Sequence, residues 1–216
     1  MVSANKMILQ NREEGAHLLA GRLREYRNCD TIVVGVGLGG ASIGFSLAKE
    51  LNLAFELVLC RQMKDPGNPK RTIGSVSDGE VIIHDESRDM PQDFLAHQIS
   101  RLQYEVKSDL KFLFGDRVKP SFKNRTVILV CDLLDNSDKL IAALRWVKAQ
   151  KTFQIIVAAP FVSSQAIKGI SDYIDDLVFL RMESNQLDSE SCYEKFPKVD
   201  LSEAKRLVNE ATKKIN

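Results

Sequence analysis

The chain has little cysteine, little histidine and no long apolar run, and each shortage excludes a class of protein. Its 4 Cys residues lie far apart, so the sequence shows neither a disulfide framework nor the Cys-x-x-Cys spacing of a zinc site. Its 3 His residues give few partners for a Ser-His-Asp triad. No apolar run approaches the ~20 residues that span a bilayer, and no secretory signal is evident. We therefore expect no membrane association and a cytoplasmic location.

Neither sign of charge dominates the composition. The chain has 30 Lys and Arg against 29 Asp and Glu, a formal net charge of +1, so there is no overall basic field to attract nucleic acid. We expect no nucleic-acid partner. With 44% hydrophobic residues, the 216-residue chain has enough apolar surface for a core, which predicts a single domain over 1–216.

Short β-branched runs alternate with helical patterns along most of the chain. Strands are expected at 31–36, 55–60, 81–84, 126–131, 153–159 and 177–180. Helices are expected at 11–23, 41–51, 93–114, 138–148 and 163–170, with a last one after Asp200. This alternation predicts an α/β fold with a mainly parallel sheet and helices on both faces.

The long helix expected at 93–114 has one apolar stripe and one polar face. The stripe consists of Leu95, Ile99, Leu102, Val106, Leu110 and Leu113. The polar face either lies in solvent or packs against a second copy of the chain, so a homodimer stays open.

The segment 62–78 interrupts the regular alternation. It contains Pro66, Gly67, Asn68, Pro69 and Gly74 together with the cations Lys64, Lys70 and Arg71. We expect a long mobile loop between the second and third strands. Such a loop could close over an anionic ligand, with Arg61 at its base. An ordinary solvated loop is the alternative.

The segment 125–140 has the outline of an anion-binding strand, loop and helix. Residues 125–130 read as a buried strand, and 140–147 have the apolar spacing of a helix packed on it. Between them lie the polar residues Asp132, Asp135, Asn136 and Ser137. Backbone N–H groups at such a helix start attract anions. The last three of these residues are also good helix caps, so a cap without a ligand is the alternative.

The order of several motifs resembles one known family almost from end to end. The motifs are NREEGAHLL from Asn11, Gly39 and Gly40 after the first strand, Arg61 with Pro66 to Pro69, Ile73-Gly74, and Tyr193 and Phe196 before the last helix. The chain is identified by these as a type I phosphoribosyltransferase, of a bacterial subfamily of predicted members. That resemblance implies a small hood formed by the 62–80 loop and the terminal segments.

The resemblance is weakest at the expected active site. In the family, two acids after the strand hold the ribose hydroxyls of phosphoribosyl pyrophosphate, and a Gly-x-x-Thr-Gly loop holds its 5′-phosphate. Here Asp132 matches the second acid, but Cys131 replaces the first, and Leu133 and Ser137 replace the loop glycines. Asp135 adds a negative charge that repels a phosphate. The phosphate motif is therefore degraded, which is typical of a pseudoenzyme.

Two functions follow from this resemblance. A working enzyme would transfer ribose 5-phosphate to a nitrogenous acceptor with Mg²⁺, and its activity is expected to be weak or lost. The resemblance assigns ribose to Asp132, phosphate to Asn136 and Ser137, and pyrophosphate to Gly39, Gly40 and Arg61. Asp135 lies in the same substrate site, and the hood loop consists of Lys64, Gly67, Asn68, Lys70 and Arg71. Asp132 is also a candidate metal ligand. The alternative is a non-catalytic module that binds a phosphorylated small molecule.

The glycines of the first strand and helix suggest a third function, the binding of a dinucleotide. Gly35, Gly37 and Gly40 fit the dinucleotide fingerprint G-x-G-x-x-G in its usual strand-to-helix setting. The second strand ends at Arg61 and not at the acid that NAD requires, so the fingerprint would suit NADP.

Overall fold

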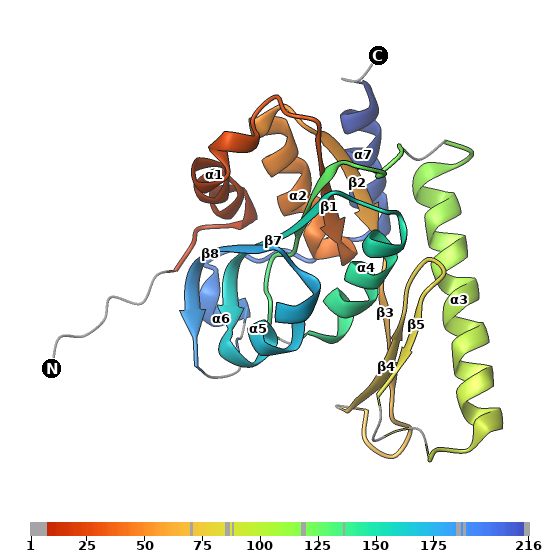
Figure 1. Cartoon of the computed structure of the whole chain (residues 1–216). Helices are drawn as coiled ribbons and strands as arrows, with labels where there is room; N and C mark the ends of the chain where they lie inside the picture. The colour runs from red at the N-terminus through yellow and green to blue at the C-terminus, as the bar shows by residue number, and fades with distance from the viewer. Residues whose placement is uncertain are drawn as a thin grey trace, which may run out of the picture.

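The main body of the protein is a parallel five-stranded sheet (Figure 1). The computed structural model describes residues 8–69, 71–84, 87, 89–117, 120–135, 137–184, 187 and 189–213. The sheet has the order β2-β1-β6-β7-β8 and consists of β1 (Thr31–Val36), β2 (Ala54–Val58), β6 (Thr126–Val130), β7 (Gln154–Ser163) and β8 (Asp176–Glu183). The predicted parallel sheet is confirmed, with β7 and β8 longer than their β-branched runs.

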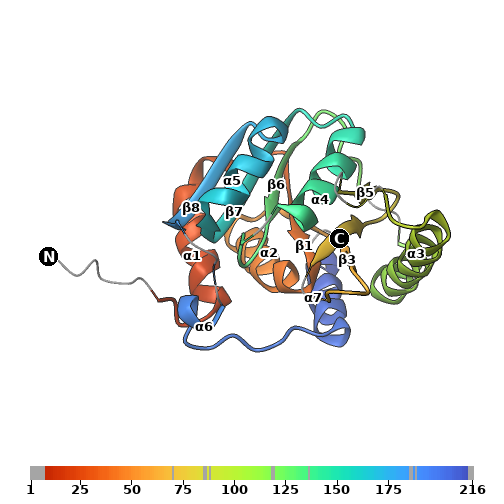
Figure 2. The ribbon, with the colours of Figure 1, turned by 90° about the horizontal axis from the view of Figure 1, so that it is seen from below.

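Helices cover both faces of this sheet, as predicted (Figure 2). On one face lie α1 (Arg12–Arg22), α2 (Gly37–Leu51) and α7 (Leu201–Lys213). On the other lie α4 (Asp138–Ala149) and α5 (Ser164–Ile170). Shorter elements are η1 (Arg24–Tyr26), η3 (Ser171–Tyr173) and α6 (Ser189–Cys192).

The central strand β1 shows why this sheet is buried on both sides. All six of its residues are buried. Val33 packs into the core under α1, α2 and α7, whereas Ile32 and Val34 pack into the core under α4 and α5. Side chains alternate between the two faces of a strand, so a continuous β-branched run satisfies both cores.

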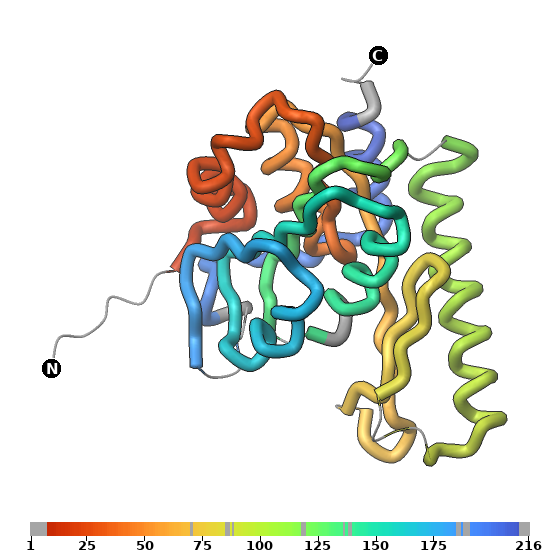
Figure 3. Tube along the Cα trace, in the orientation of Figure 1, coloured from red at the N-terminus to blue at the C-terminus, as the bar shows by residue number. Residues whose placement is uncertain are grey.

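The expectation of a long loop over 62–78 is wrong. This region contains β3 (Arg61–Lys64) and β4 (Thr72–Val76), which form an antiparallel three-stranded sheet with β5 (Val81–Ile83) (Figure 3). The proline and glycine residues of 66–69 form only the turn, in which Gly67 N–H donates to Asp65 Oδ1 at 2.8 Å. The strands β3 and β4 were missed because they have only 4 and 5 residues and most of β3 is polar, whereas β5 lies within the strand predicted at 81–84.

Helix α3 (Gln92–Phe114) lies along this small sheet and gives it a core (Figure 1). The core consists of Met63, Ile73, Val76, Leu95 and Leu102. The predicted apolar stripe of α3 is therefore confirmed, and it has two partners. Its first half packs on the small sheet, whereas Val106, Leu110 and Leu113 pack into the main core beside α7. Across the described ranges, no helix is both long and apolar enough to cross a bilayer.

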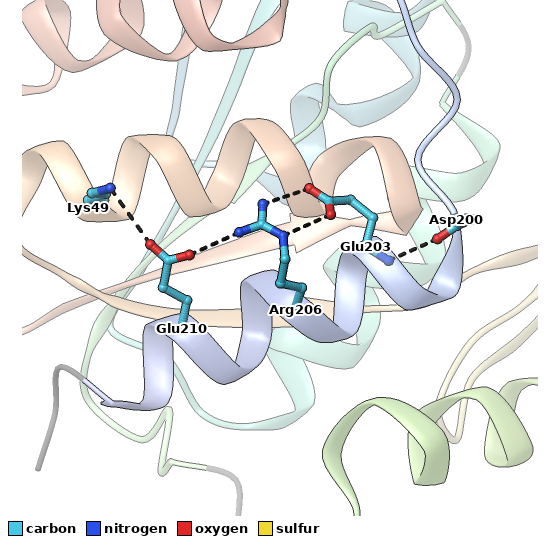
Figure 4. A network of polar contacts seen from close by, with 5 residues as sticks. All are labelled: Lys49, Asp200, Glu203, Arg206 and Glu210. Atoms are coloured by element: carbon cyan, nitrogen blue, oxygen red, sulfur yellow. Dashed lines mark hydrogen bonds and ion pairs between the residues drawn. The ribbon is translucent and has the colours of Figure 1, made fainter.

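The C-terminal segment returns across the body of the protein. Tyr193 forms a parallel β-bridge with Leu9, which brings the segment after α6 beside the N-terminal residues. The chain then reaches α7, which packs on α2. A surface network links the two helices: Lys49 pairs with Glu210, and Arg206 bridges Glu210 and Glu203 (Figure 4).

Candidate functional site

A cavity of about 560 Å³ opens at the carboxyl ends of β1, β2 and β6. This is the edge at which α/β proteins bind ligands. Its lining residues are Arg12, Val36, Gly37, Leu38, Gly39, Leu59, Cys60, Arg61, Asp109, Cys131, Asp132, Leu133, Leu134, Asp135, Leu140, Phe196, Lys198 and Val199. The structure thus brings together four of the predicted site residues, namely Gly39, Arg61, Asp132 and Asp135.

Glycines form the turn from β1 into α2 at the rim of this cavity. Gly37 has φ +70°, a left-handed conformation that residues with side chains rarely adopt. Gly40 lies against the end of β6, where an added Cβ would come within 2.7 Å of the Val130 carbonyl oxygen. Gly40 therefore packs the helix against the sheet and does not line the cavity. Close packing also explains Gly35, since an added Cβ there would lie 2.8 Å from the Gly40 carbonyl carbon.

Asp132 is held in place by an arginine from the start of α1. Arg12 Nε donates to Asp132 Oδ2 at 2.9 Å, and only 7% of the Arg12 side chain is exposed, against 18% for Asp132. Oδ1 of Asp132 has no hydrogen-bond partner within the described residues. The carboxylate therefore has one oxygen fixed by Arg12 and one that can accept from a ligand.

The C-terminal segment supports this pair with aromatic rings. Phe196 stacks on Tyr193 with ring centroids 4.9 Å apart, and the Arg12 guanidinium lies 3.7 Å above the Phe196 ring. Arg12 also donates to the Pro197 carbonyl at 2.7 Å, and the Tyr193 hydroxyl donates to the Asp132 carbonyl at 2.6 Å. Burial, with the nearby Asp132 carboxylate, raises the Tyr193 pKa far above its ordinary value, while Arg12 opposes this. Tyr193 is thus a neutral donor that positions Asp132.

Arg61 lies at the opposite side of the cavity and is held by helix α3. Its guanidinium donates to Asp109 and forms an ion pair with Glu105 at 3.8 Å. Glu105 and Asp109 are four residues apart, so they lie on the same face of α3. The cation expected to meet pyrophosphate is therefore already paired with two carboxylates.

The loop after β6 is tied to the neighbouring strand. Leu134 forms a bridge with Val162 of β7, and Ser163 Oγ donates to the Asp135 carbonyl at 2.8 Å. Ser137 is the N-cap residue of α4, as the capping alternative expected, but its side chain makes no capping hydrogen bond, because its backbone is α-helical. Its side chain lies beside Gly169 of α5, where an added Cβ would meet Ser137 Cβ at 2.7 Å.

Several other predicted site residues lie elsewhere. In the described part of the chain, Ser137 and the hood-loop residues Lys64, Gly67, Asn68 and Arg71 do not line the cavity. Lys64 instead donates to Thr72 at 2.9 Å, and Arg71 pairs with Asp65 at 3.4 Å. The positions of Asn136 and Lys70 lie outside the described residues.

Sequence reasoning missed three charged residues of the cavity: Arg12, Asp109 and Lys198. Arg12 belongs to the NREEGAHLL motif, but no role was predicted for it. Its neighbour Asn11 caps α1, since Glu14 N–H donates to the Asn11 side chain at 3.0 Å. A signal for Arg12 was its spacing from Gly15, Ala16 and Leu19, which places it on the apolar face of the predicted helix, where a charge needs a partner. Asp109 and Lys198 gave no local signal.

These features define an α/β protein with its site at the carboxyl edge of a parallel sheet, where an acid, a glycine turn and several cations meet. The chain belongs to the phosphoribosyl transferase domain family, whose sequence model matches residues 4–193.

One relative and two solved structures are similar to this chain. A Mycobacterium tuberculosis protein, named provisionally as a phosphoribosyl transferase in two strains, is 22% identical over 177 residues, which is 80% of this chain. The chain spans only 40% of the length of that relative. The crystal structure of TT1426 from Thermus thermophilus has 24% identity and a TM-score of 0.79, covering 94% of this chain and 99% of that one. AQ2163 from Aquifex aeolicus has 10% identity and a TM-score of 0.50, with 83% and 76% covered. These structures show the fold.

The family implies Mg²⁺, which prefers six oxygen ligands in an octahedral arrangement. Within the described residues, no three His, Cys, Asp or Glu side chains gather to hold a metal ion. Asp132 already has one oxygen bound to Arg12. The residues present do not fit a dedicated Mg²⁺ site, so a ligand's own phosphate oxygens would have to supply most of the coordination.

Proposed function

We propose that this cavity binds the ribose 5-phosphate part of a phosphorylated small molecule, and that transfer from phosphoribosyl pyrophosphate is weak or lost. The observation that carries the proposal is the Asp132 carboxylate, which lines the cavity with Oδ2 held by Arg12 and Oδ1 open to a ligand. A fixed carboxylate oxygen is a strong acceptor for a sugar hydroxyl. The phosphate then pairs with Lys198, which lines the same cavity and makes no ion pair within the described residues.

Transfer would require contacts that this cavity has not kept. Cys131 stands where the family has its first acid, and a thiol is a weak hydrogen-bond partner for a ribose hydroxyl. Arg61 is paired with Asp109 and Glu105, so its charge is already compensated. Each charge-assisted hydrogen bond contributes roughly 1.5–3 kcal/mol, and losing two of them removes several powers of ten in transition-state binding.

A non-catalytic, regulatory binding module is the second candidate. It is favoured by the tied loop after β6, because Leu134 and Asp135 are held by β7 and leave a rigid cavity wall. Such a site can recognise a phosphorylated metabolite without acting on it.

The test is isothermal titration of ribose 5-phosphate and of phosphoribosyl pyrophosphate with Mg²⁺, with NADP in the same buffer. We expect ribose 5-phosphate to bind and NADP not to bind. Asp132→Asn, which keeps the shape but removes the charge, should weaken ribose 5-phosphate at least tenfold, as should Lys198→Ala. A parallel assay of pyrophosphate release with a panel of nucleobases should show little or no turnover.

Matched controls lie close by. Lys195→Ala removes an exposed cation three residues from Lys198 and outside the cavity lining, and Asp172→Asn removes an exposed carboxylate in η3. Both should bind like the parent chain. Thermal unfolding of each variant separates lost binding from lost folding. Rapid pyrophosphate release by the parent would refute the proposed loss of transfer. Equal affinity of Lys195→Ala and Lys198→Ala for ribose 5-phosphate would refute the placement of the phosphate at Lys198.

A further inference from the structure

Arg61, at the rim of the cavity, is held by two carboxylates of helix α3. We propose that Asp109, assisted by Glu105, determines the charge of the ligand: the cavity accepts a monophosphate and rejects a diphosphate at the Arg61 side. This specificity role rests on the proposed function, since it concerns the same cavity. The role is carried by the geometry of three side chains from two different elements.

The contacts place Asp109 as the dominant partner. Its carboxylate accepts a hydrogen bond from the Arg61 guanidinium, and only 15% of its side chain is exposed. Glu105, one turn earlier, lies 3.8 Å from Arg61 and is shared with Arg101 at 3.6 Å. Asp109 also lines the cavity, whereas Glu105 does not. An anion that approaches Arg61 must therefore meet the Asp109 carboxylate as well.

The charges around the cavity are balanced before any ligand enters. Its lining cations are Arg12, Arg61 and Lys198, and its lining acids are Asp109, Asp132 and Asp135. Arg12 is paired with Asp132, and Arg61 with Asp109. Lys198 alone among these cations makes no ion pair within the described residues. The cavity therefore has one cation for a phosphate and no further one for a pyrophosphoryl group.

Because of the position of Arg61, the Asp109 carboxylate and a bound pyrophosphate would compete for the same guanidinium. Arg61 begins β3, three residues after the end of β2, and α3 lies along the small sheet that starts there (Figure 1). A pyrophosphate on the β1 and β2 side would need the guanidinium that Asp109 holds. The Asp109 carboxylate already pairs with the Arg61 guanidinium. In this partly buried setting its negative charge also repels a second anion.

The experiment compares binding of inorganic pyrophosphate and ribose 5-phosphate, without nucleobase, by isothermal titration. In Asp109→Asn the side chain keeps its shape and loses its charge. We expect pyrophosphate affinity to rise about tenfold or more, as for a charge-assisted hydrogen bond that becomes available. Ribose 5-phosphate affinity should change less than about twofold, because Lys198 and Asp132 are unaltered. Glu105→Gln should give a smaller gain in pyrophosphate binding.

Two further variants make the test specific. Asp116→Asn removes an exposed carboxylate just beyond the end of α3, so it changes the net charge equally without touching Arg61. It should bind pyrophosphate like the parent. In the double variant Arg61→Ala with Asp109→Asn, the gain should disappear, because it depends on the guanidinium.

The possible results separate this specificity role from the proposed function. No gain in folded Asp109→Asn, an equal gain in Asp116→Asn, or a gain that persists in the double variant would each overturn the role of Asp109. Failure of the parent to bind ribose 5-phosphate would refute the proposed function alone, since an Arg61-dependent pyrophosphate gain in Asp109→Asn is measured independently.

Discussion

The carboxylate of Asp132 lies directly against Gly39, the third residue of α2. A Cβ added at Gly39 would come within 2.7 Å of Asp132 Cγ and 2.9 Å of its Oδ1. Real Cβ atoms do not approach other atoms so closely, so the two residues fit only because one of them has no side chain. Gly39, which is predicted to lie near pyrophosphate, thus also leaves room for Asp132, the acid proposed to hold ribose.

Gly39→Ala should therefore damage the site. The new methyl group would push the Asp132 carboxylate away from Arg12, which strains a buried ion pair. We expect about 1–3 kcal/mol lower stability, as for overpacking, and at least tenfold weaker binding of ribose 5-phosphate. Urea denaturation and isothermal titration measure the two effects.

Gly21→Ala is the matched control for that substitution. Gly21 lies in α1 and an added Cβ would meet nothing within 4 Å. Alanine has the higher helix propensity, so a gain of about 0.5 kcal/mol in stability is expected, with unchanged binding. If both variants lost stability and binding equally, the contact with Asp132 would not explain the effect at Gly39.

Arg12→Ala should be the most disruptive change at an ion pair. It removes the bond to Asp132, the bond to the Pro197 carbonyl and the stacking on Phe196, and it leaves a largely buried carboxylate without its partner. Since Asp132 keeps 18% exposure, we expect about 2–4 kcal/mol of lost stability, somewhat under the full cost of breaking a buried pair. Arg12→Lys should recover only part of it, because the planar stacking is lost.

Arg206→Ala tests whether burial or the number of contacts determines how much stability is lost when an arginine is removed. Arg206 makes three hydrogen bonds to Glu203 and Glu210 (Figure 4), one more than Arg12 makes, yet it lies in solvent. Exposed ion pairs contribute little because water screens them. Urea denaturation should show a much smaller loss than for Arg12→Ala, and a loss of similar size would contradict this account.

The main sheet could be predicted from the sequence because its strands are buried on both faces. A strand such as β1 is apolar at every position after Thr31, without alternating polar residues, so it is easily recognised between polar segments. The strands β3 and β4 could not be recognised, since only Met63 in β3 faces the α3 core and the rest of that strand is polar or charged. Their stability comes from α3, which begins only at Gln92, later in the chain than both strands.

Only those site residues that belong to a sequence motif could be predicted. Asp132 and Gly39 follow the strands β6 and β1, and a family signature marks them. The partners that decide their chemistry are remote: Arg12 is 120 residues from Asp132, and Asp109 is 48 residues from Arg61. No local periodicity encodes such pairs, which form only when the sheet, α1 and α3 have packed.

Ser163→Ala should loosen the cavity wall. Ser163 Oγ donates to the Asp135 carbonyl and accepts from Ala166 N–H at 3.1 Å, and the residue is buried. Loss of both bonds should cost about 1–2 kcal/mol in urea denaturation. The neighbouring Ser164→Ala removes only a weak 3.5 Å bond to the Ser184 carbonyl and should have little effect. Equal losses in the two variants would exclude the proposed hold on the loop.

Tyr193 should make stability fall in alkaline solution. Its folded-state pKa is raised chiefly by burial and then by the Asp132 carboxylate, whereas in the unfolded chain it ionises near its ordinary value of 10.0. Above about pH 10 the unfolded chain therefore loses a proton that the folded chain keeps, and stability decreases by up to about 1.4 kcal/mol per pH unit. Below pH 10 both states hold the proton, and the contribution of Tyr193 is fully present.

Tyr193→Phe isolates this contribution. At pH 7 the variant should be less stable by about 1 kcal/mol, because the 2.6 Å hydrogen bond to the Asp132 carbonyl is lost. Above pH 10 the difference between parent and variant should shrink and then reverse, since phenylalanine cannot ionise in the unfolded chain. Urea denaturation at pH 7, 9, 10 and 11 measures it. A constant difference over that range would mean that Tyr193 ionises as readily in the folded chain as in the unfolded one, and that its hydroxyl is not the buried neutral donor that positions Asp132.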